Sequence, residues 1–239
     1  MTIVIKLPGA GMIKKGPSTS SIDWLSYRDY RIDADFYRDL LKLISSQDNT
    51  QQWVIVSGGV GSHLQTNFAR EMHASADELK AIGTDHVRTL QKVFLSYCSR
   101  SGASVHEVLV PVTELNAVMA DSRATIFFVD PDIRYASTDT LAAAAAQAIA
   151  ADKLIVFKAK VPVFSAGFPT PTRIEKWPIA DLGARAESFE AQNPGHYIMD
   201  SASVQIIRSA GISTWLLAPD NYIALFDPEQ CESATEIVL

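Results

Sequence analysis

Cysteines, long apolar runs and an excess of basic residues are all rare or missing in this chain, and each scarcity excludes a class of protein. Only two cysteines occur among the 239 residues, Cys98 and Cys231, and they show neither a CxxC pattern nor metal-ligand spacing. This usage argues against a disulfide framework and a thiolate metal site, and we expect reduced thiols in a cytoplasmic protein. The longest apolar-rich stretch, residues 141–151, is dominated by alanine and too short to span a bilayer.

Basic residues do not outnumber acidic ones, since 21 Lys and Arg face 27 Asp and Glu, for a net charge of −6. This balance argues against nucleic acid or an anionic membrane as the main partner. The sequence also contains no internal repeat or low-complexity segment, and its first residues are typical of a strand, not of a signal peptide. With 47% hydrophobic and 20% charged residues, the chain can build a large core. We expect a single domain over residues 1–239.

One stretch, residues 53–62, carries the strongest local signal. The apolar run at residues 53–56 predicts a short buried strand, and Gly58, Gly59 and Gly61 follow it directly. Glycines allow a tight turn whose backbone N–H groups can converge on an anion. A strand followed by a glycine turn and a helix is the usual build of a phosphate-binding edge in an α/β sheet. The alternative interpretation is a glycine turn that binds nothing.

Apolar patterns of strand and helix period alternate along the chain. Strands are predicted at residues 2–7, 53–56, 105–112, 125–129, 154–158, 212–217, 222–226 and 235–239. Helices are predicted at residues 33–44, 64–72, 85–99, 114–121, 141–151, 181–192 and 199–210, with Gly102 and Gly211 as terminating glycines and residues 161–178 mostly as loop. This order predicts an α/β fold, a three-layer αβα sandwich with a mainly parallel central sheet.

Three polar or glycine-rich turns follow predicted strands, at residues 6–11, 57–62 and 137–140. Ligands in open α/β sheets bind outside the carboxyl ends of the strands, so we expect these turns to converge at one edge. Lys6 ends the first strand, and its alternative role is that of a lysine extending into solvent. Asp139 and Asp85 each have an alternative role as the N-cap of a helix.

Taken in order, these turns resemble the amino acid kinase family, with its uridylate kinase branch as the nearest likeness. The strand-Lys-x-x-Gly opening of that family is similar to residues 6–9, and its Gly-Gly-Gly turn is similar to residues 57–59. Residues 82–87 resemble the Gly-Asp-x-Met-Gly segment that starts a long helix in uridylate kinases. Residues 137–139 stand in the place of Thr-Thr-Asp before an alanine-rich helix, and a lysine-rich turn follows at residues 158–160. The ordered set covers nearly the whole chain.

The resemblance implies a kinase that transfers the γ-phosphoryl group of ATP to a small-molecule oxyanion, with Mg²⁺ held mainly by ATP. The acceptor side would lie within about residues 1–130 and the nucleotide side within about residues 131–239. Lys6 would neutralise charge on the transferring group, Asp139 would orient the lysines, and glycine N–H groups would hold phosphate oxygens. The roles implied are catalytic for Lys6, Asp139 and Lys160, cofactor-binding for Gly9, Gly58, Gly59, Thr138 and Lys158, and substrate-binding for Gly61, His63 and Asp85. Of Lys158 and Lys160, we assign the site-facing role to Lys160, because it stands in the place of the family's lysine.

Two departures from the family pattern keep a second hypothesis open. The Lys-Val-Asp-Gly-Val-Phe segment of uridylate kinases is Lys-Val-Pro-Val-Phe at residues 160–164, and residues 165–169 do not match the adenine-side loop. The acceptor is therefore not predicted to be uridylate. The alternative function is a non-catalytic protein that binds or stores a nucleotide or another anion, as a molybdenum-storage relative does. The family resemblance also implies a homo-oligomer, from dimer to hexamer, with apolar residues of segments 32–44 and 85–99 at its interfaces.

Overall fold

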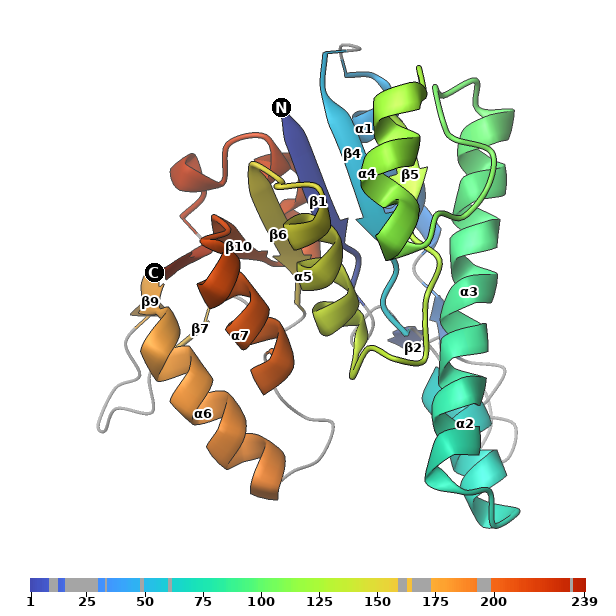
Figure 1. Ribbon diagram of the computed structural model, residues 1–239, viewed down its shortest axis with the longest axis vertical. Helices are drawn as coiled ribbons and strands as arrows, with labels where there is room; N and C mark the ends of the chain where they lie inside the picture. The colour runs from blue at the N-terminus through green and yellow to red at the C-terminus, as the bar shows by residue number, and fades with distance from the viewer. Residues whose placement is uncertain are drawn as a thin grey trace.

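A seven-stranded sheet forms the centre of the computed structural model, with strand order β5–β4–β1–β6–β10–β11–β9 (Figure 1). The structure describes residues 1–8, 13–15, 30–32, 34–47, 50–59, 62–158, 163–164, 173–192, 199–232 and 234–239. The sheet comprises β1 (Thr2–Lys6), β4 (Gln52–Val56), β5 (Ile126–Phe128), β6 (Lys153–Phe157), β9 (Lys176–Pro178), β10 (Thr214–Leu217) and β11 (Thr235–Val238). Two short ribbons pair β2 (Ile13–Lys15) with β3 (Tyr30–Ile32) and β7 (Val163–Phe164) with β8 (Arg173–Ile174).

The strand β1 lies at the middle of the sheet, parallel to β4 on one side and to β6 on the other. Lys6, the last residue of β1, pairs with Val56 and Val156 across the two neighbours. The carboxyl ends of the three central strands are therefore level with one another. The direction changes at β11, which runs antiparallel to β10, and β9 runs parallel to β11. The mainly parallel α/β sheet predicted from the sequence is confirmed.

Helices cover both faces of the sheet, as the αβα prediction requires (Figure 1). They are α1 (Ala34–Ser45), α2 (Ser62–Glu71), α3 (Ala76–Arg100), α4 (Val112–Asp121), α5 (Thr138–Ala148), α6 (Ile179–Gln192) and α7 (Ser201–Ala210), with 3₁₀ turns η2 (Pro219–Leu225) and η3 (Pro228–Gln230). The helices α4, α5 and α7 pack on one face, and α1, α3 and η2 pack on the other. No helix in the described part of the chain combines the length and apolarity that crossing a membrane requires.

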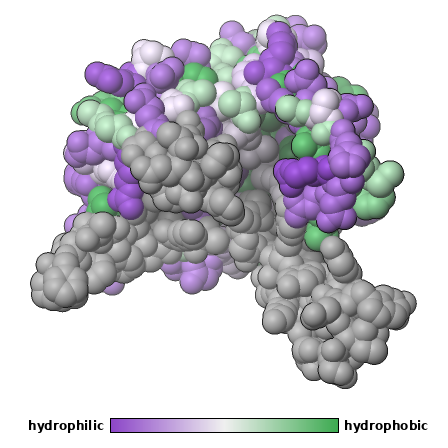
Figure 2. Space-filling model, turned by 90° about the horizontal axis from the view of Figure 1, so that it is seen from below, coloured by the Kyte–Doolittle hydropathy of each residue, from purple (hydrophilic) through white to green (hydrophobic). Residues whose placement is uncertain are grey.

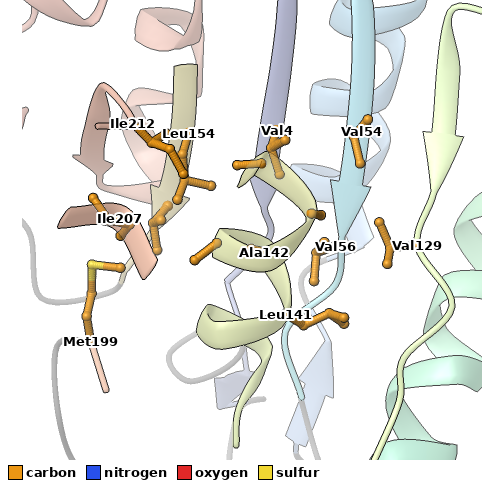
Figure 3. Close-up of a cluster of buried hydrophobic side chains, with 14 of the residues drawn as sticks. Val4, Val54, Val56, Val129, Leu141, Ala142, Leu154, Met199, Ile207 and Ile212 are labelled. Atoms are coloured by element: carbon orange, nitrogen blue, oxygen red, sulfur yellow. The ribbon is translucent and has the colours of Figure 1, made fainter. Parts of the chain in front are cut away.

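The alternation of side chains along each strand divides the core in two. Val4, Val54 and Leu154 point to the face that carries α5, where Figure 3 shows them around Ala142. Ile3, Ile5 and Ile55 point to the opposite face, where they pack in a cluster with aromatic side chains such as Phe36. The α5 face is lined by small residues, since four alanines of α5 are fully buried: Ala142, Ala143, Ala145 and Ala146. Small side chains let this helix lie close to the sheet.

Two predicted strands are wrong. Residues 105–112 form only isolated bridges to the edge of the sheet, at Val105 and Val110, because the chain bends between them and Pro111 leads into α4. Residues 222–225 belong to η2, a 3₁₀ turn that begins at Pro219 and stacks Tyr222 edge-on against Phe36, and Phe226 is its C-cap. The apolar pattern of that segment reflects i to i+3 packing on the core, not strand alternation.

The long helix α3 begins at Ala76, nine residues before the predicted start at residue 85. Ser75 and Glu78 form a capping box, in which the Ser75 hydroxyl accepts from the Glu78 N–H and the Glu78 carboxylate accepts from the Ser75 N–H. The prediction that Gly102 and Gly211 terminate helices is confirmed by their positive φ angles of 73° and 65°. Residues 161–178, predicted mostly as loop, include the strands β7, β8 and β9, and Asp33, the predicted cap of α1, lies outside the described residues.

Candidate active site

The carboxyl edge of the central strands brings together side chains that are far apart in sequence. Lys6 ends β1, Gly58 follows β4, and Lys158 follows β6. The N-terminus of α5 meets the same edge, because Asp139 forms ion pairs with both lysines. The expectation that Gly58 and Asp139 lie at the same edge of one sheet is met. Figure 2 views the molecule from below, onto the end where these strands terminate, and shows hydrophilic residues on its left and right sides.

Two lysines share one buried carboxylate at this edge. Lys6 Nζ lies 3.1 Å from Asp139 Oδ1, and Lys158 Nζ donates to Asp139 Oδ2. Lys6 is 5% exposed and Asp139 is 3% exposed, so the interpretation of Lys6 as a lysine extending into solvent is wrong. The trio carries a net charge of +1 in a poorly solvated place. A group of this kind is suited to receive an anion.

The pKa values of these groups show which physical effect dominates at each one. Burial lowers the pKa of Lys6 from 10.5 to about 8, and the attraction of Asp139 only partly offsets this, while Lys158 adds repulsion. At Asp139, burial alone would raise the pKa, but the charges of Lys158 and Lys6 outweigh it and hold the pKa below its usual range. The carboxylate is therefore ionised at neutral pH, and Lys6 is close to its titration point.

The N-terminal turn of α5 places Asp139 between the lysines. Ser137 is the N-cap, and its Oγ accepts hydrogen bonds from the backbone N–H of Asp139 at 2.9 Å and of Thr140 at 3.1 Å. The alternative role of Asp139 as the cap of this helix is thus wrong, since Asp139 is the second residue of α5 and its carboxylate binds lysines. Thr138, the first residue of α5, lies next to it and is half-buried. The helix begins three residues earlier than predicted because Ser137 caps it.

The glycine turn after β4 lies beside this trio. Gly59 O accepts from the backbone N–H of Ser62 at 3.1 Å and from the Ser62 hydroxyl at 2.8 Å, which ties the turn to the start of α2. A Cβ at Gly59 would come within 2.9 Å of Ser62 Oγ, so a larger residue there would displace the Ser62 hydroxyl from its bond to Gly59 O. Gly9, Gly61 and Lys160 lie outside the described residues, as does the side chain of His63. Of the two lysines that follow β6, the structure places Lys158 against Asp139.

A cavity of about 500 Å³ opens between α3, the start of α4 and the connection from β5 to α5. Asp85 lines the cavity from within α3, and its alternative role as a helix cap is wrong. It pairs with Arg88, whose Nε donates to Asp130 Oδ1 at 2.8 Å and whose Nη2 donates to Pro131 O at 2.6 Å. The hydrogen bond to Asp130 raises the pKa of Arg88. Arg88 thus fastens α3 to the loop that leads toward α5.

Sequence reasoning missed the residues that shape this cavity. The Asp130-Pro131-Asp132 motif indicated only a turn, and Arg88 was one polar residue of a predicted helix. No local pattern reveals this pairing, because Arg88 and Asp130 lie 42 positions apart and are brought together only by the fold. No cluster of three or more histidine, cysteine or acidic side chains suited to a metal ion occurs among the residues whose placement is described.

Comparisons with known proteins agree with this architecture. The uridylate kinase from Archaeoglobus fulgidus superimposes with a TM-score of 0.70 at 19% sequence identity, over the whole of both chains. The UMP kinase from Ureaplasma parvum gives 0.65 at 17% identity over 100% of this chain and 98% of that one. The aspartate kinase from Synechocystis gives 0.68 at 14% identity over 100% of this chain and 40% of that one.

These solved structures, at such low identities, establish the fold. A search of curated protein sequences finds no match to the chain. A family model described as the amino acid kinase family, in contrast, matches residues 1–217, which is most of the 239 residues. The chain therefore belongs to the amino acid kinase family.

Proposed function

We propose that this protein is an ATP-dependent phosphotransferase that acts on a phosphate- or carboxylate-bearing metabolite. The observation that carries the proposal is the pair of lysines, Lys6 and Lys158, that converge on buried Asp139 at the carboxyl edge of the sheet. Membership of the amino acid kinase family supports it. Phosphoryl transfer requires positioning and charge neutralisation more than covalent chemistry. The two lysines can neutralise charge on the transferring group, and Asp139 can position them.

In this proposal, Asp139 holds the two ammonium groups where negative charge spreads over the transferring phosphoryl oxygens. The Asp139 carboxylate neutralises one of the two positive charges, which leaves one for the ligand. Asp139 Oδ1 accepts no well-directed hydrogen bond, so the Lys6 ammonium keeps N–H donors for ligand oxygens. Gly58, Gly59 and Gly9 supply backbone N–H groups, and Thr138 and Lys160 complete the proposed set.

ATP and Mg²⁺ fit this donor set in different ways. Cationic and N–H donors suit the polyphosphate of ATP. Since the described residues offer no carboxylate cluster for a metal, Mg²⁺ would be held mainly by the phosphates. We propose that the acceptor binds beside Asp85, in the cavity between α3 and the connection from β5 to α5, with Gly61 and His63 as further contacts. The arginines of that cavity are already paired, Arg88 with Asp85 and Asp130, and Arg134 with Asp132.

The proposal is tested by thermal shift with Mg-ATP, followed by a screen for ATP consumption with phosphate- and carboxylate-bearing metabolites. Stabilisation by Mg-ATP is expected, because a ligand that binds only the native state raises its stability by mass action. Lys6→Ala should lower turnover by about 10²–10³, or about 3–4 kcal/mol of barrier. Lys153 at the opposite end of β6 is the matched control, and Lys153→Ala should retain wild-type turnover. A flat response to ATP, ADP and GTP would contradict the proposal.

A second candidate function is the binding or storage of an anion without turnover. The observation in its favour is the sequence Lys-Val-Pro at residues 160–162, which lacks the Asp-Gly pair of uridylate kinases. This candidate predicts that Lys6→Ala weakens the affinity for inorganic phosphate or ATP in a calorimetric titration. It also predicts that no acceptor in the screen consumes ATP. If the wild type turns over any acceptor and Lys6→Ala abolishes that turnover, the kinase function is supported over the binding function.

A further inference from the structure

We propose that Asp200 is a positioning residue, which fixes the N-terminal turn of α5 and thereby holds Asp139 between Lys6 and Lys158. The kinetic part of this inference rests on the proposed phosphotransferase function, and the structural part stands without it. Asp200 lies 61 positions after Asp139 and is 3% exposed. The sequence pattern placed it only in a predicted helix, residues 199–210.

Hydrogen-bond donors from two helices converge on the Asp200 carboxylate. Its Oδ1 accepts from the backbone N–H of Ser203 at 2.8 Å, so that Asp200 is the N-cap of α7. The same oxygen accepts from Thr140 Oγ1 at 2.7 Å. Its Oδ2 accepts from the hydroxyl of Ser137. One side chain therefore caps α7 and grips the first turn of α5.

The bond from Ser137 to Asp200 decides how Ser137 can cap α5. A serine hydroxyl has one proton to donate and two lone pairs that accept. Because the Asp200 carboxylate only accepts, the hydroxyl proton must point toward it. Both lone pairs of Ser137 Oγ then face the N–H groups of Asp139 and Thr140, which they accept at 2.9 Å and 3.1 Å. Asp200 thus sets the direction of the cap that fixes Asp139.

The surroundings of Asp200 favour a carboxylate at this position. The helices α5 and α7 lie side by side, and their N-termini meet at Asp200 (Figure 1). The N-terminus of a helix carries partial positive charge, so two of them stabilise a negative group between them. Asp200 and Asp139 have different partners, because Asp200 receives hydroxyl and amide donors whereas Asp139 receives the two lysines. The Asp139 N–H donates to Ser137 Oγ, and the Ser137 hydroxyl donates to Asp200. Asp200 is therefore linked to the backbone of Asp139 through Ser137.

An asparagine cannot replace Asp200 without breaking this network. All three groups that reach the carboxylate are donors, namely Ser137 Oγ, Thr140 Oγ1 and the Ser203 N–H. The asparagine amide offers one accepting oxygen and one NH₂ group, so at least one of those donors faces another donor. Asp200→Asn should therefore loosen the first turn of α5 at nearly constant side-chain volume. Ser203→Ala is the matched control, since it removes only the bond from Ser203 Oγ to the backbone oxygen of Asp200.

The first readout is the titration of Lys6 by NMR in the ligand-free protein, with its signal identified by its loss in Lys6→Arg. In the wild type the pKa of Lys6 is about 8, and the pairing with Asp139 helps to keep it from falling further. When Asp139 is released, the pKa of Lys6 should drop by about one unit, or tenfold in proton affinity. Asp200→Asn should show this drop and Ser203→Ala should not. Equal titration curves in the wild type and Asp200→Asn would overturn the proposal.

The second readout is kinetic. A displacement of a catalytic group by about 1 Å costs on the order of 10² in rate, so kcat of Asp200→Asn should fall by that amount with little change in KM for Mg-ATP. If no acceptor is turned over but the Lys6 titration shifts as expected, the phosphotransferase function fails while the positioning role of Asp200 holds. If Asp200→Asn does not fold, Ser137→Ala tests the same link from the other side. An unshifted Lys6 titration in Ser137→Ala would overturn the proposal.

Discussion

The two faces of the central sheet are built from different side chains, and the difference explains where the candidate site lies. The face that carries α5 is packed mainly with alanine and branched aliphatic side chains, with Phe127 and Trp177 as its buried rings. The opposite face is packed with aromatic rings, among them Phe36, Tyr37, Phe94 and Phe157. Rings hold their helices further from a sheet than methyl groups do. Among the described helices, α5 on the alanine face places its first turn against the end of β1, where Asp139 pairs with Lys6.

The comparison teaches that stability and chemistry are carried by different faces. Aromatic pairs on the α1 and α3 face, such as Phe36 with Tyr37 at 5.1 Å between ring centroids, bury large areas without touching the trio. The alanine face holds α5 at the distance that the ion pairs of Asp139 require. Changes on the two faces should therefore affect different measurements, and the predictions below test this separation.

The largest expected effect on stability belongs to the aromatic face. Trp53 is 1% exposed and packs edge-on against Phe226 near the amino end of β4, away from the candidate site. Trp53→Ala should lower the free energy of unfolding by about 3–5 kcal/mol, measured by urea denaturation, because it removes a large buried ring and leaves a cavity. The Lys6 titration and any turnover should stay close to the wild type below the midpoint of unfolding. A loss of turnover in the folded variant would show that the faces are not separate.

The converse change is made on the alanine face. Ala142 lies one turn after Asp139 and is fully buried between α5 and the sheet (Figure 3). Ala142→Leu should cost about 1–3 kcal/mol of stability through overpacking. It should also push the start of α5 away from β1 and lower turnover by on the order of 10². Ala148→Leu, at an exposed position near the end of α5, is the control and should change neither quantity. Wild-type turnover in folded Ala142→Leu would contradict this account of the alanine face.

The central part of this architecture could be predicted from the sequence because local residue patterns determine it. Buried runs predicted β1, β4 and β6, and the polar turn before the alanines predicted the start of α5 near Asp139. The local rules failed where tertiary contacts decide, as in η2, whose apolar pattern serves packing on Phe36. The Ser75–Glu78 capping box was a readable signal that the prediction of α3 overlooked. The contacts of Asp200 with α5 and of Arg88 with Asp130 had no such signal, since they join residues 60 to 63 and 42 positions apart.

A smaller effect concerns pH. The Lys6 ammonium must be charged to stabilise the transferring group, and burial lowers its pKa to about 8. Turnover should therefore fall about tenfold per unit as the pH rises above about 8. Stability should respond in the opposite sense. Between about 8 and 10.5 the unfolded chain binds more protons than the native one, so the cost of burying Lys6 shrinks as the pH rises.

The pH dependence is checked by a rate profile of the wild type beside one of Lys6→Arg. A guanidinium stays charged throughout this range, so any residual turnover of Lys6→Arg should show no decline near pH 8. Lys153→Arg, at the far end of β6, should keep the wild-type profile. An identical decline in Lys6→Arg would assign the titration to a group other than Lys6.

The smallest expected effect on the folded subunit comes from a surface that neither core uses. The segment at residues 32–44 was expected to pack a partner as well as the core, and Phe36, Leu40 and Leu41 of α1 are buried in the core. Among the described residues, a group of exposed apolar side chains lies on the α2 and α3 hairpin, where Phe68 and Met72 are 67% and 68% exposed one helical turn apart. We therefore predict a homo-oligomer that buries this hairpin, with an interface above about 1,000 Å².

Light scattering tests this prediction against the subunit mass of 26.1 kDa. The wild type should show a multiple of that mass, and Phe68→Ser should shift it toward the single subunit. The stability of the subunit itself should change by less than about 0.5 kcal/mol, because an exposed side chain contributes little to the core. Val108→Ser alters an exposed apolar residue in the connection from α3 to α4 and should leave the mass unchanged. A clean 26.1 kDa species for the wild type would refute the predicted homo-oligomer.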